Sequence, residues 1–546
     1  MNSKDNDIYE HNYTTAKISA MTTDFKKNLI GVPDAKDEWR ANKSEAEAKF
    51  INIDSYNEFA DPSALFLVGR IGTGKTAILN KLQYSIQQGL NTDYQTVVLI
   101  DANEYIAQLS STLRLRGLSE FSYTEIENIA ICEWKKVLNT IAMKAFHCYC
   151  VKNGIATLKA VQSYLAKEHL LNVGMDTRRI LELISENLKN TDNFFSKTAA
   201  VVTEFASENI GDYNAALLEL ESALCSTGNK ILILVDSVER YEFYDQIILA
   251  VLNAMTDVCV YFSEEDKGVA VKMALPSELV PNLLSINLEK TINKMVYIRW
   301  NQADLKSLIA VRLYKCITQV NGTINLETAL DFFNNYYEQN CITTQEFKFP
   351  TFAYCMSYSQ KKPRQLISIF NTWLNLEQKF PKKNKMSLVS YAIAQHELIR
   401  VQGAFTIYRS VHPNMFDMFK KTFANQIYCF SESDFDIWLK ACSSLRGNMD
   451  AYDLKRYFIA SGLVGIMVEL HTIEKGTLPF ENDRVIRIKE VLFEYQYKER
   501  LPFNNQTKFC LHPMCYRVLN TKIDLNTFVY PKPLEIEDEY VPWATK

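Results

Sequence analysis

The residues best placed to do chemistry form a glycine-rich segment near position 70. Residues 69–76 read GRIGTGKT and match the phosphate-binding pattern G-x-x-x-x-G-K-[ST] at every fixed position. The glycines let backbone N–H groups turn toward phosphate oxygens, Lys75 is expected to reach the β- and γ-phosphates, and the Thr76 hydroxyl is a ligand for Mg²⁺. The segment therefore predicts that the chain binds ATP with Mg²⁺. The residues expected to contact the nucleotide are Gly69, Arg70, Ile71, Gly72, Thr73, Gly74, Lys75, Thr76 and Ala77.

A phosphate-binding loop needs a carboxylate to hold the metal ion, and one ends an apolar run farther along the chain. Asp236 closes the run ILILVD, where the second metal ligand beside Thr76 is expected. Ser237 follows, where a water-polarising acid is usual, and Glu239 is the nearest acid that could orient water. A solvated charge at a helix start is an equally good interpretation of Glu239. The predicted catalytic residues are Lys75, Asp236 and Glu239, and slow ATP hydrolysis is expected.

A basic segment, KKPRQL at residues 361–366, opens an amphipathic helix. An arginine at a helix start opposes the helix dipole, and a nearby anion would relieve that conflict. A γ-phosphate is such an anion, so Arg364 is predicted to contact the nucleotide and report its state. An exposed basic turn is the alternative.

Five short apolar runs predict the strands of a parallel sheet that is buried on both faces. They are LFLVG (65–69), TVVLID (96–101), ILILVD (231–236), VAVKMALP (269–276) and MVYIRW (295–300). The stretch between the second and third runs is too long for one crossover helix, so residues 105–225 are predicted to form a helical insertion. The expected fold class is α/β: a P-loop NTPase parallel sheet with this insertion, a helical lid and a C-terminal winged-helix-like domain.

The same pattern divides the chain into four parts. We expect a polar arm over residues 1–24, an ATPase core over 25–301, a helical lid over 302–425 and a winged-helix-like domain over 426–546. In the last part, two helical segments precede two alternating segments, RVIRIKEVLFEYQY and KFCLHPMCYRVL, which are predicted to form a β-ribbon around a turn at 502–505.

The charge of the C-terminal part weakens a DNA-binding interpretation. Residues 426–546 carry 15 Lys and Arg against 17 Asp and Glu, and the second predicted helix offers only Lys455 and Arg456 as cations. Affinity for DNA comes mostly from neutralising phosphates. We therefore favour a protein-contact module, with DNA kept as the alternative partner.

Composition sets outer limits on the function. The chain has 546 residues, 60 Lys and Arg, 64 Asp and Glu and a net charge of −4, which disfavours a polybasic nucleic-acid coat. The best apolar run, residues 457–468, is too short to span a bilayer, and the polar N-terminus lacks the features of a signal peptide. A cytoplasmic protein with no membrane partner is expected. Its 12 cysteines show no zinc-binding spacing, and His512 is predicted to lie in a core or interface.

Several blocks in this order resemble bacterial FunZ-type P-loop ATPases, which belong with the AAA+ and STAND-like ATPases. They are residues 28–39, 68–79, 231–240, 274–279, 298–305 and 361–366, together with KFCLHPMCYRVL. The resemblance implies an ATPase core, a helical lid, a C-terminal winged helix and a sensor-2 position at Pro363 and Arg364. It also implies nucleotide-controlled homo-oligomers and a role in anti-phage defence. The sequence shows no fused nuclease, hydrolase or membrane effector, so a defence role is expected to use a separate effector protein.

The expected function is thus an ATP-dependent switch whose nucleotide state controls oligomerisation or partner binding. Three departures favour slow turnover: Ser237 replaces an acid, no polar residue ends the fourth strand at Leu275-Pro276, and no arginine lies between Pro276 and Met295. Two alternatives stay open. One is a DNA-binding AAA+ protein, such as an initiator-like loader or transposition regulator, and the other is a nucleotide-bound scaffold with little turnover.

Overall fold

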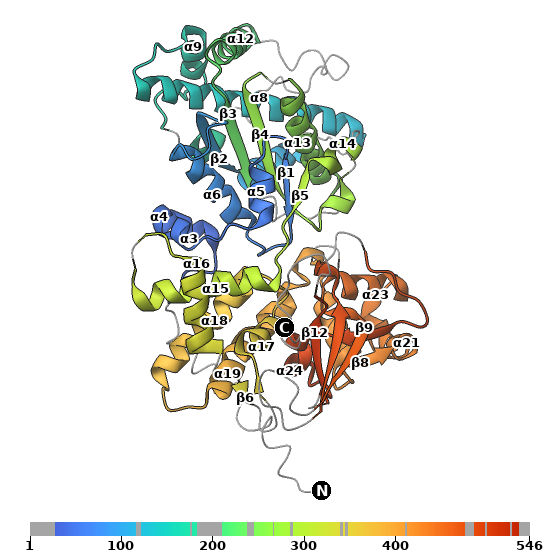
Figure 1. The fold of residues 1–546 in the computed structure, drawn as a ribbon. Coiled ribbons are helices and arrows are strands. Elements are labelled where there is room, and N and C mark those ends of the chain that lie inside the picture. The colour runs from blue at the N-terminus through green and yellow to red at the C-terminus, as the bar shows by residue number, and fades with distance from the viewer. Residues whose placement is uncertain are drawn as a thin grey trace. The chain divides into compact units, whose positions relative to one another are not determined.

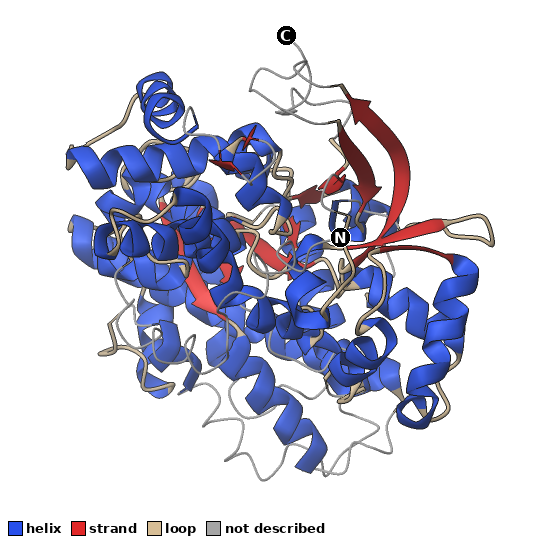
Figure 2. Ribbon diagram, turned by 90° about the horizontal axis from the view of Figure 1, so that it is seen from below, coloured by secondary structure: helices blue, strands red, loops and turns tan. Residues whose placement is uncertain are grey.

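The structure is a computed structural model of the whole chain. It describes residues 28–533 except 116–121, 175–176, 183–209, 237–244, 266, 284–287, 321, 339–341, 344–347, 410–411, 475–484, 497–499 and 525–526. The chain divides into two compact units, one of residues 52–299 and one of residues 1–51 with 300–546. Helices dominate the described part (Figure 2).

The unit of residues 52–299 is built on a five-stranded parallel sheet in the order β2-β3-β4-β1-β5 (Figure 1). The strands are β1 (Phe66–Gly69), β2 (Thr96–Asp101), β3 (Ile231–Asp236), β4 (Val269–Pro276) and β5 (Met295–Tyr297). All five predicted runs are strands, although β5 ends before Trp300. Every residue of β1 and β3 is buried, as expected for a parallel sheet covered by helices.

Helices connect and cover these strands. They are α5 (Asp54–Ala60), α6 (Lys75–Gln87), α7 (Asn103–Leu115), α8 (Tyr123–Asn153), α9 (Lys159–Lys167), α12 (Ile210–Thr227), α13 (Gln246–Glu265) and α14 (Leu288–Asn293). Helix α6 packs on β2 and β3, and α8 packs along α13. The described part of the segment between β2 and β3 is helical, as the sequence predicts. A capping box at Ser122 and Glu125 fixes the start of α8, and Gly154 at φ +67° ends it.

Helix α13 corrects the expectation about apolar segments. Among the described residues, α13 is the one helix that is long and apolar enough to cross a membrane. Residues 457–468, the expected best apolar run, instead form the end of one helix and the start of a strand. Two thirds of the apolar stretch of α13 is buried inside the protein. The indole Nε1 of Trp134 on α8 donates to the carbonyl of Val251 on α13 at 3.0 Å. A helix that is buried to this extent fits the core of a folded unit, so we interpret α13 as a core helix.

The second unit combines the N-terminal segment with the helical and C-terminal parts. Its helices before residue 425 are α3 (Ala35–Ala41), α4 (Lys43–Ala48), α15 (Gln302–Thr318), α16 (Leu326–Phe333), α17 (Thr351–Ser357), α18 (Pro363–Lys379), α19 (Lys385–Gly403) and α20 (Met415–Phe423). A π-helical turn (Asn334–Glu338) follows α16, and β6 (Ile342–Thr343) pairs with β7 (Lys348–Phe349).

Residues 28–51, which were expected in the ATPase core, lie in one compact unit with the helical lid. Glu38 on α3 forms a buried, two-bond ion pair with Arg312 on α15, with both N···O distances at 2.8 Å. Asn371 on α18 bonds the backbone of Ile30 and Gly31 at 2.9 Å each. A buried ion pair is costly to separate, so it fixes this segment to the lid. The predicted boundaries stay predictions, and residues 1–24 lie outside the described part.

The C-terminal part has the winged-helix-like fold that the sequence predicts. Its helices are α21 (Glu432–Leu439), α22 (Ser443–Arg446), α23 (Ala451–Ala460) and α24 (Tyr516–Leu519). Its sheet has the order β12-β10-β9-β11-β8, formed by β8 (Cys429–Ser431), β9 (Val464–Ile473), β10 (Ile486–Leu492), β11 (Lys508–Leu511) and β12 (Thr527–Pro531).

The pairing of the ribbon differs from the prediction. The two alternating segments give β10 and β11, but these strands do not pair with each other, because β9 lies between them. The start of β9 overlaps the apolar run of residues 457–468, which hides the strand in the sequence. Glycine at 465 fits this position, because a side chain there would meet Val491 and Phe493 within 2.6 Å.

The lid helices and the C-terminal sheet share a hydrophobic core. Ile486 and Ile488 of β10 and Tyr530 of β12 lie in the same cluster as the buried faces of α15, α18 and α19. His512 adds a polar link, since its Nε2 lies 3.1 Å from the carbonyl of Ser359. The imidazole is fully buried, which confirms the prediction of a core histidine. Burial lowers the pKa of His512 to about 3, which keeps the ring neutral.

Candidate nucleotide-binding site

The phosphate-binding loop joins β1 to α6 at the carboxyl edge of the parallel sheet (Figure 1). Gly72 and Gly74 adopt φ values of +87° and +102°, a region that side chains other than glycine rarely enter. A side chain at Gly69 would meet the Thr73 hydroxyl at 2.6 Å. The three glycines of the motif therefore meet conformational or steric needs of this loop.

Lys75 occupies the first residue of α6 and closes the loop on itself. Its side chain is 4% exposed, and Nζ donates to the carbonyls of Gly69 at 2.8 Å and Arg70 at 3.2 Å. The Thr73 hydroxyl donates to the Arg70 carbonyl at 2.7 Å. An ammonium held over the loop, at the positive end of a 13-residue helix, gives the loop the electrostatics of an anion site.

The carboxylate expected to hold the metal ion lies at the same sheet edge. Asp236 is the last residue of β3 and is 6% exposed, and β4 lies between β3 and the loop strand β1. The Thr76 hydroxyl and the Asp236 carboxylate provide hard oxygen donors, which fit Mg²⁺. Their roles as metal ligands stay predictions. Ser237 and Glu239 lie outside the described residues, so the predicted water-orienting role of Glu239 also stays a prediction.

Asp101 shows how a neighbouring carboxylate at this edge is used differently. It lies opposite Asp236 in the β2–β3 register, and its Oδ1 accepts from the N–H of Asn103 at 3.2 Å. Asp101 therefore caps the start of α7.

The structure adds polar residues that the sequence analysis missed beside the loop. Strand β4 runs to Pro276 as predicted, but Ser277 and Glu278 follow it immediately. The N–H of Ser277 donates to the Gly69 carbonyl at 3.2 Å, and Arg70 Nε lies 3.3 Å from Glu278 Oε1. No sequence spacing signals this pair, because the two residues are 208 positions apart and meet only through the β1–β4 pairing.

Arg364 lies at the start of α18, one residue after Pro363 at the first helical position. Its Nη2 pairs with Asp34 Oδ2 at 3.0 Å, and both side chains are about half exposed. Asp34 is also the N-cap of α3, accepting from the N–H of Lys36 and Asp37. The anion that offsets the dipole conflict in this structure is thus a carboxylate of the same unit. Nucleotide contact by Pro363 and Arg364 stays a prediction.

The two cations of α23 are used inside the C-terminal domain. Lys455 is 4% exposed and pairs with Glu432 and with Asp436, the latter at 2.6 Å. Arg456 pairs with Glu494 at 2.7 Å and donates to the carbonyl of Leu501 at 2.7 Å. Cations held this way do not present a phosphate-binding face.

Comparisons with known proteins found similarity to solved structures. No protein-family model matches the chain, and no curated protein matches it. The Aeropyrum pernix ORC1 protein, solved in complex with DNA, matches over 86% of this chain and 93% of its own at 11% identity, with a TM-score of 0.28. The A. pernix ORC2 protein, solved as ADPNP–ADP complexes, matches over 81% and 89% at 10% identity and 0.32. Cdc6p from Pyrobaculum aerophilum matches over 76% and 81% at 11% identity and 0.26.

These TM-scores are low and carry no conclusion about activity. The fold class follows from this chain's own features: a parallel sheet in the order β2-β3-β4-β1-β5, a loop between β1 and α6, and a C-terminal winged-helix-like sheet.

Proposed function

We propose that this chain binds Mg-ATP and hydrolyses it, slowly, as a nucleotide-controlled molecular switch. The observation that carries the proposal is the loop itself: two glycines at positive φ and a buried Lys75 at the helix start, on the sheet edge where β3 ends in Asp236. In this proposal backbone N–H groups and Lys75 bind the phosphates, Thr76 and Asp236 hold Mg²⁺, and Glu239 orients water.

The switching part of the proposal uses the separation of the chain into two units. The phosphate-binding loop belongs to one unit, and Pro363 and Arg364 belong to the other. If Arg364 contacts a γ-phosphate, one conformation of the chain binds ATP more tightly than it binds ADP. Exchange of one nucleotide for the other then shifts the populations of the two conformations. Homo-oligomerisation or binding of a separate effector protein is the proposed output. A cytoplasmic role in anti-phage defence rests on the FunZ-type resemblance alone.

Binding of a protein partner is favoured over binding of DNA. The observation is the internal pairing of Lys455 and Arg456, the two cations of the helix that would enter a groove. The alternative of an initiator-like DNA-binding protein therefore needs cations from elsewhere in the chain.

Steady-state ATP hydrolysis at low salt, with and without duplex DNA, tests these alternatives, with Lys75→Ala as the blank. Turnover that exceeds the blank and ignores DNA supports the protein-partnered switch. Strong stimulation by DNA would transfer support to the initiator-like alternative. Turnover equal to the blank, with ATP still bound, would leave the nucleotide-bound scaffold.

A further inference from the structure

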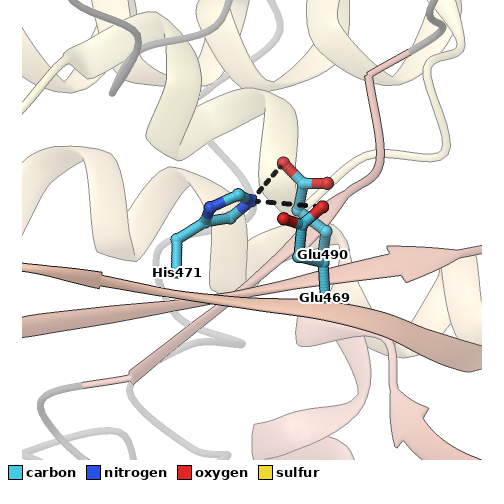
Figure 3. Close-up of side chains that lie close together, drawn as sticks. All are labelled: Glu469, His471 and Glu490. Carbon is cyan, nitrogen blue, oxygen red and sulfur yellow. Dashed lines mark ion pairs between the residues drawn. The ribbon is translucent and has the colours of Figure 1, made fainter.

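The β9–β10 hairpin carries a cluster of three possible metal ligands, far along the chain from the phosphate-binding loop (Figure 3). Glu469 and His471 lie two residues apart on β9, and Glu490 lies opposite Glu469 on β10. His471 Nε2 is 2.9 Å from Glu490 Oε1 and 3.8 Å from Glu469 Oε2. Figure 3 shows the imidazole and both carboxylates turned toward one another.

Glu490 occupies a position where the strand pattern calls for an apolar side chain. Ile486 and Ile488, on the same face of β10, are at most 1% exposed and pack in the core shared with the lid helices. Glu490 is the next residue on this buried face of β10, and it is 6% exposed. Burying a carboxylate is costly unless a cation or several hydrogen bonds compensate it.

The protein supplies little compensation. Among the described residues, His471 is the only ion-pair partner of the Glu490 and Glu469 carboxylates. The other cross-strand neighbour of Glu490 is Tyr530, whose hydroxyl bonds the Gln302 side chain. Like charges directly opposite each other on paired strands repel. The cluster therefore brings two carboxylates and one imidazole nitrogen together, with all ligand atoms within 4.8 Å of one another.

A strand irregularity lies at the same place. The β9–β10 register shifts between Glu490 and Val491, so that Val468 is an extra residue on β9 next to Glu469. Bulges of this kind redirect side chains and recur beside functional sites.

We propose that Glu469, His471 and Glu490 form a binding site for a divalent transition metal ion, with Zn²⁺ as the best match. One imidazole nitrogen and two carboxylate oxygens suit Zn²⁺, whereas Mg²⁺ and Ca²⁺ prefer oxygen ligands alone. Three protein ligands leave a coordination position open for water or another donor. The ion would neutralise the two carboxylates and connect β9 to β10. This site is independent of the proposed ATP site.

The test is metal titration of the full chain after treatment with a chelator, at pH 7.5, using Zn²⁺ by calorimetry and Co²⁺ by visible absorption. We expect one saturable site, with affinity lowered at least tenfold in His471→Ala and in Glu469→Gln. Glu469 is half exposed, so its replacement tests the ligand role without emptying a core position. Thr472→Ala, an exposed neighbour on the same strand, is the matched control and should bind like the unchanged chain.

Three results would overturn the proposal. One is the absence of saturable binding of either ion. Another is equal affinity in the two ligand variants and the control. The third is a thiolate-to-cobalt absorption band, which would place the ion on cysteines. The first result, together with a lower thermal stability of His471→Ala than of Thr472→Ala, would instead assign His471 as a bridge between the two carboxylates without a metal ion.

Discussion

At the scale of single residues, the candidate site depends on one lysine and one aspartate that the fold holds at a single sheet edge. Lys75 donates to two backbone carbonyls of the loop, and these hydrogen bonds hold its ammonium at the loop. Asp236 ends β3 in a buried position, where the surrounding protein would shield a metal-bound carboxylate from bulk water. Preorganised charge of this kind is what phosphoryl transfer uses.

Asp236→Asn should preserve ATP binding and lower Mg²⁺-dependent hydrolysis at least 100-fold, because the amide keeps the shape but loses the charge that holds the metal ion. Single-turnover hydrolysis, together with ATP affinity measured in EDTA, would show both effects. Asp101→Asn is the matched control, since Asp101 lies opposite Asp236 and caps a helix, a role that asparagine also fills. Equal activity of both variants would remove Asp236 from the mechanism.

At the scale of elements, the local sequence predicts strands and the loop well but predicts partners poorly. The five apolar runs form the five parallel strands, because a strand that is buried on both faces needs an almost continuous apolar sequence. The β9 strand was missed because it begins buried and ends exposed at Val468 and Leu470, so it lacks one regular alternation. The pairs Arg70–Glu278 and Arg364–Asp34 were missed because no local pattern reports contacts between residues hundreds of positions apart.

Helix α23 illustrates how a contact changes an interpretation. Lys455→Glu should lower the free energy of unfolding by about 3–5 kcal/mol, because it places a third carboxylate beside Glu432 and Asp436 in a buried position. Chemical denaturation measures the loss. Lys440→Glu, at an exposed position, should change stability by less than about 0.5 kcal/mol. Intact stability of Lys455→Glu with lost DNA affinity would contradict the internal role of Lys455.

The burial of His512 should make the stability of the protein depend on pH. Burial lowers the pKa of His512 to about 3, so the unfolded chain binds a proton more readily than the folded chain between about pH 6.5 and pH 3. The His512 contribution is therefore complete above pH 6.5 and is lost as the pH falls through this window.

Between pH 7 and pH 5 this loss amounts to roughly 2 kcal/mol. Urea unfolding at several pH values should show a shallower dependence in His512→Gln, which cannot take up that proton. An unchanged dependence in the variant would show that other groups account for acid sensitivity.

At the scale of the whole molecule, the chain is two units, and the N-terminal segment belongs with the lid and the C-terminal domain. Sequence order suggested otherwise, because residues 28–51 precede the phosphate-binding loop directly. The buried pair between Glu38 and Arg312 explains the assignment, since both side chains are at most 9% exposed and bond at two points.

Arg312→Met should therefore destabilise this unit by about 3–5 kcal/mol and release the N-terminal segment, because it leaves Glu38 buried without its partner. Limited proteolysis should cut within residues 28–51 much faster in the variant than in the unchanged chain. Arg40→Ala is the control, since Arg40 is 71% exposed and its ion pair with Asp37 is long, at 3.9 Å. Unchanged proteolysis in Arg312→Met would contradict the anchoring role of the pair.

The central claim is that the loop of residues 69–76 binds Mg-ATP, and equilibrium binding of ATP to the full chain, with and without Mg²⁺, tests it most directly. The account predicts saturable binding at one site per chain that Mg²⁺ strengthens. It also predicts that Lys75→Ala lowers the affinity at least 100-fold while the variant still unfolds in a single cooperative transition. Tight Mg-ATP binding that survives Lys75→Ala would contradict the account.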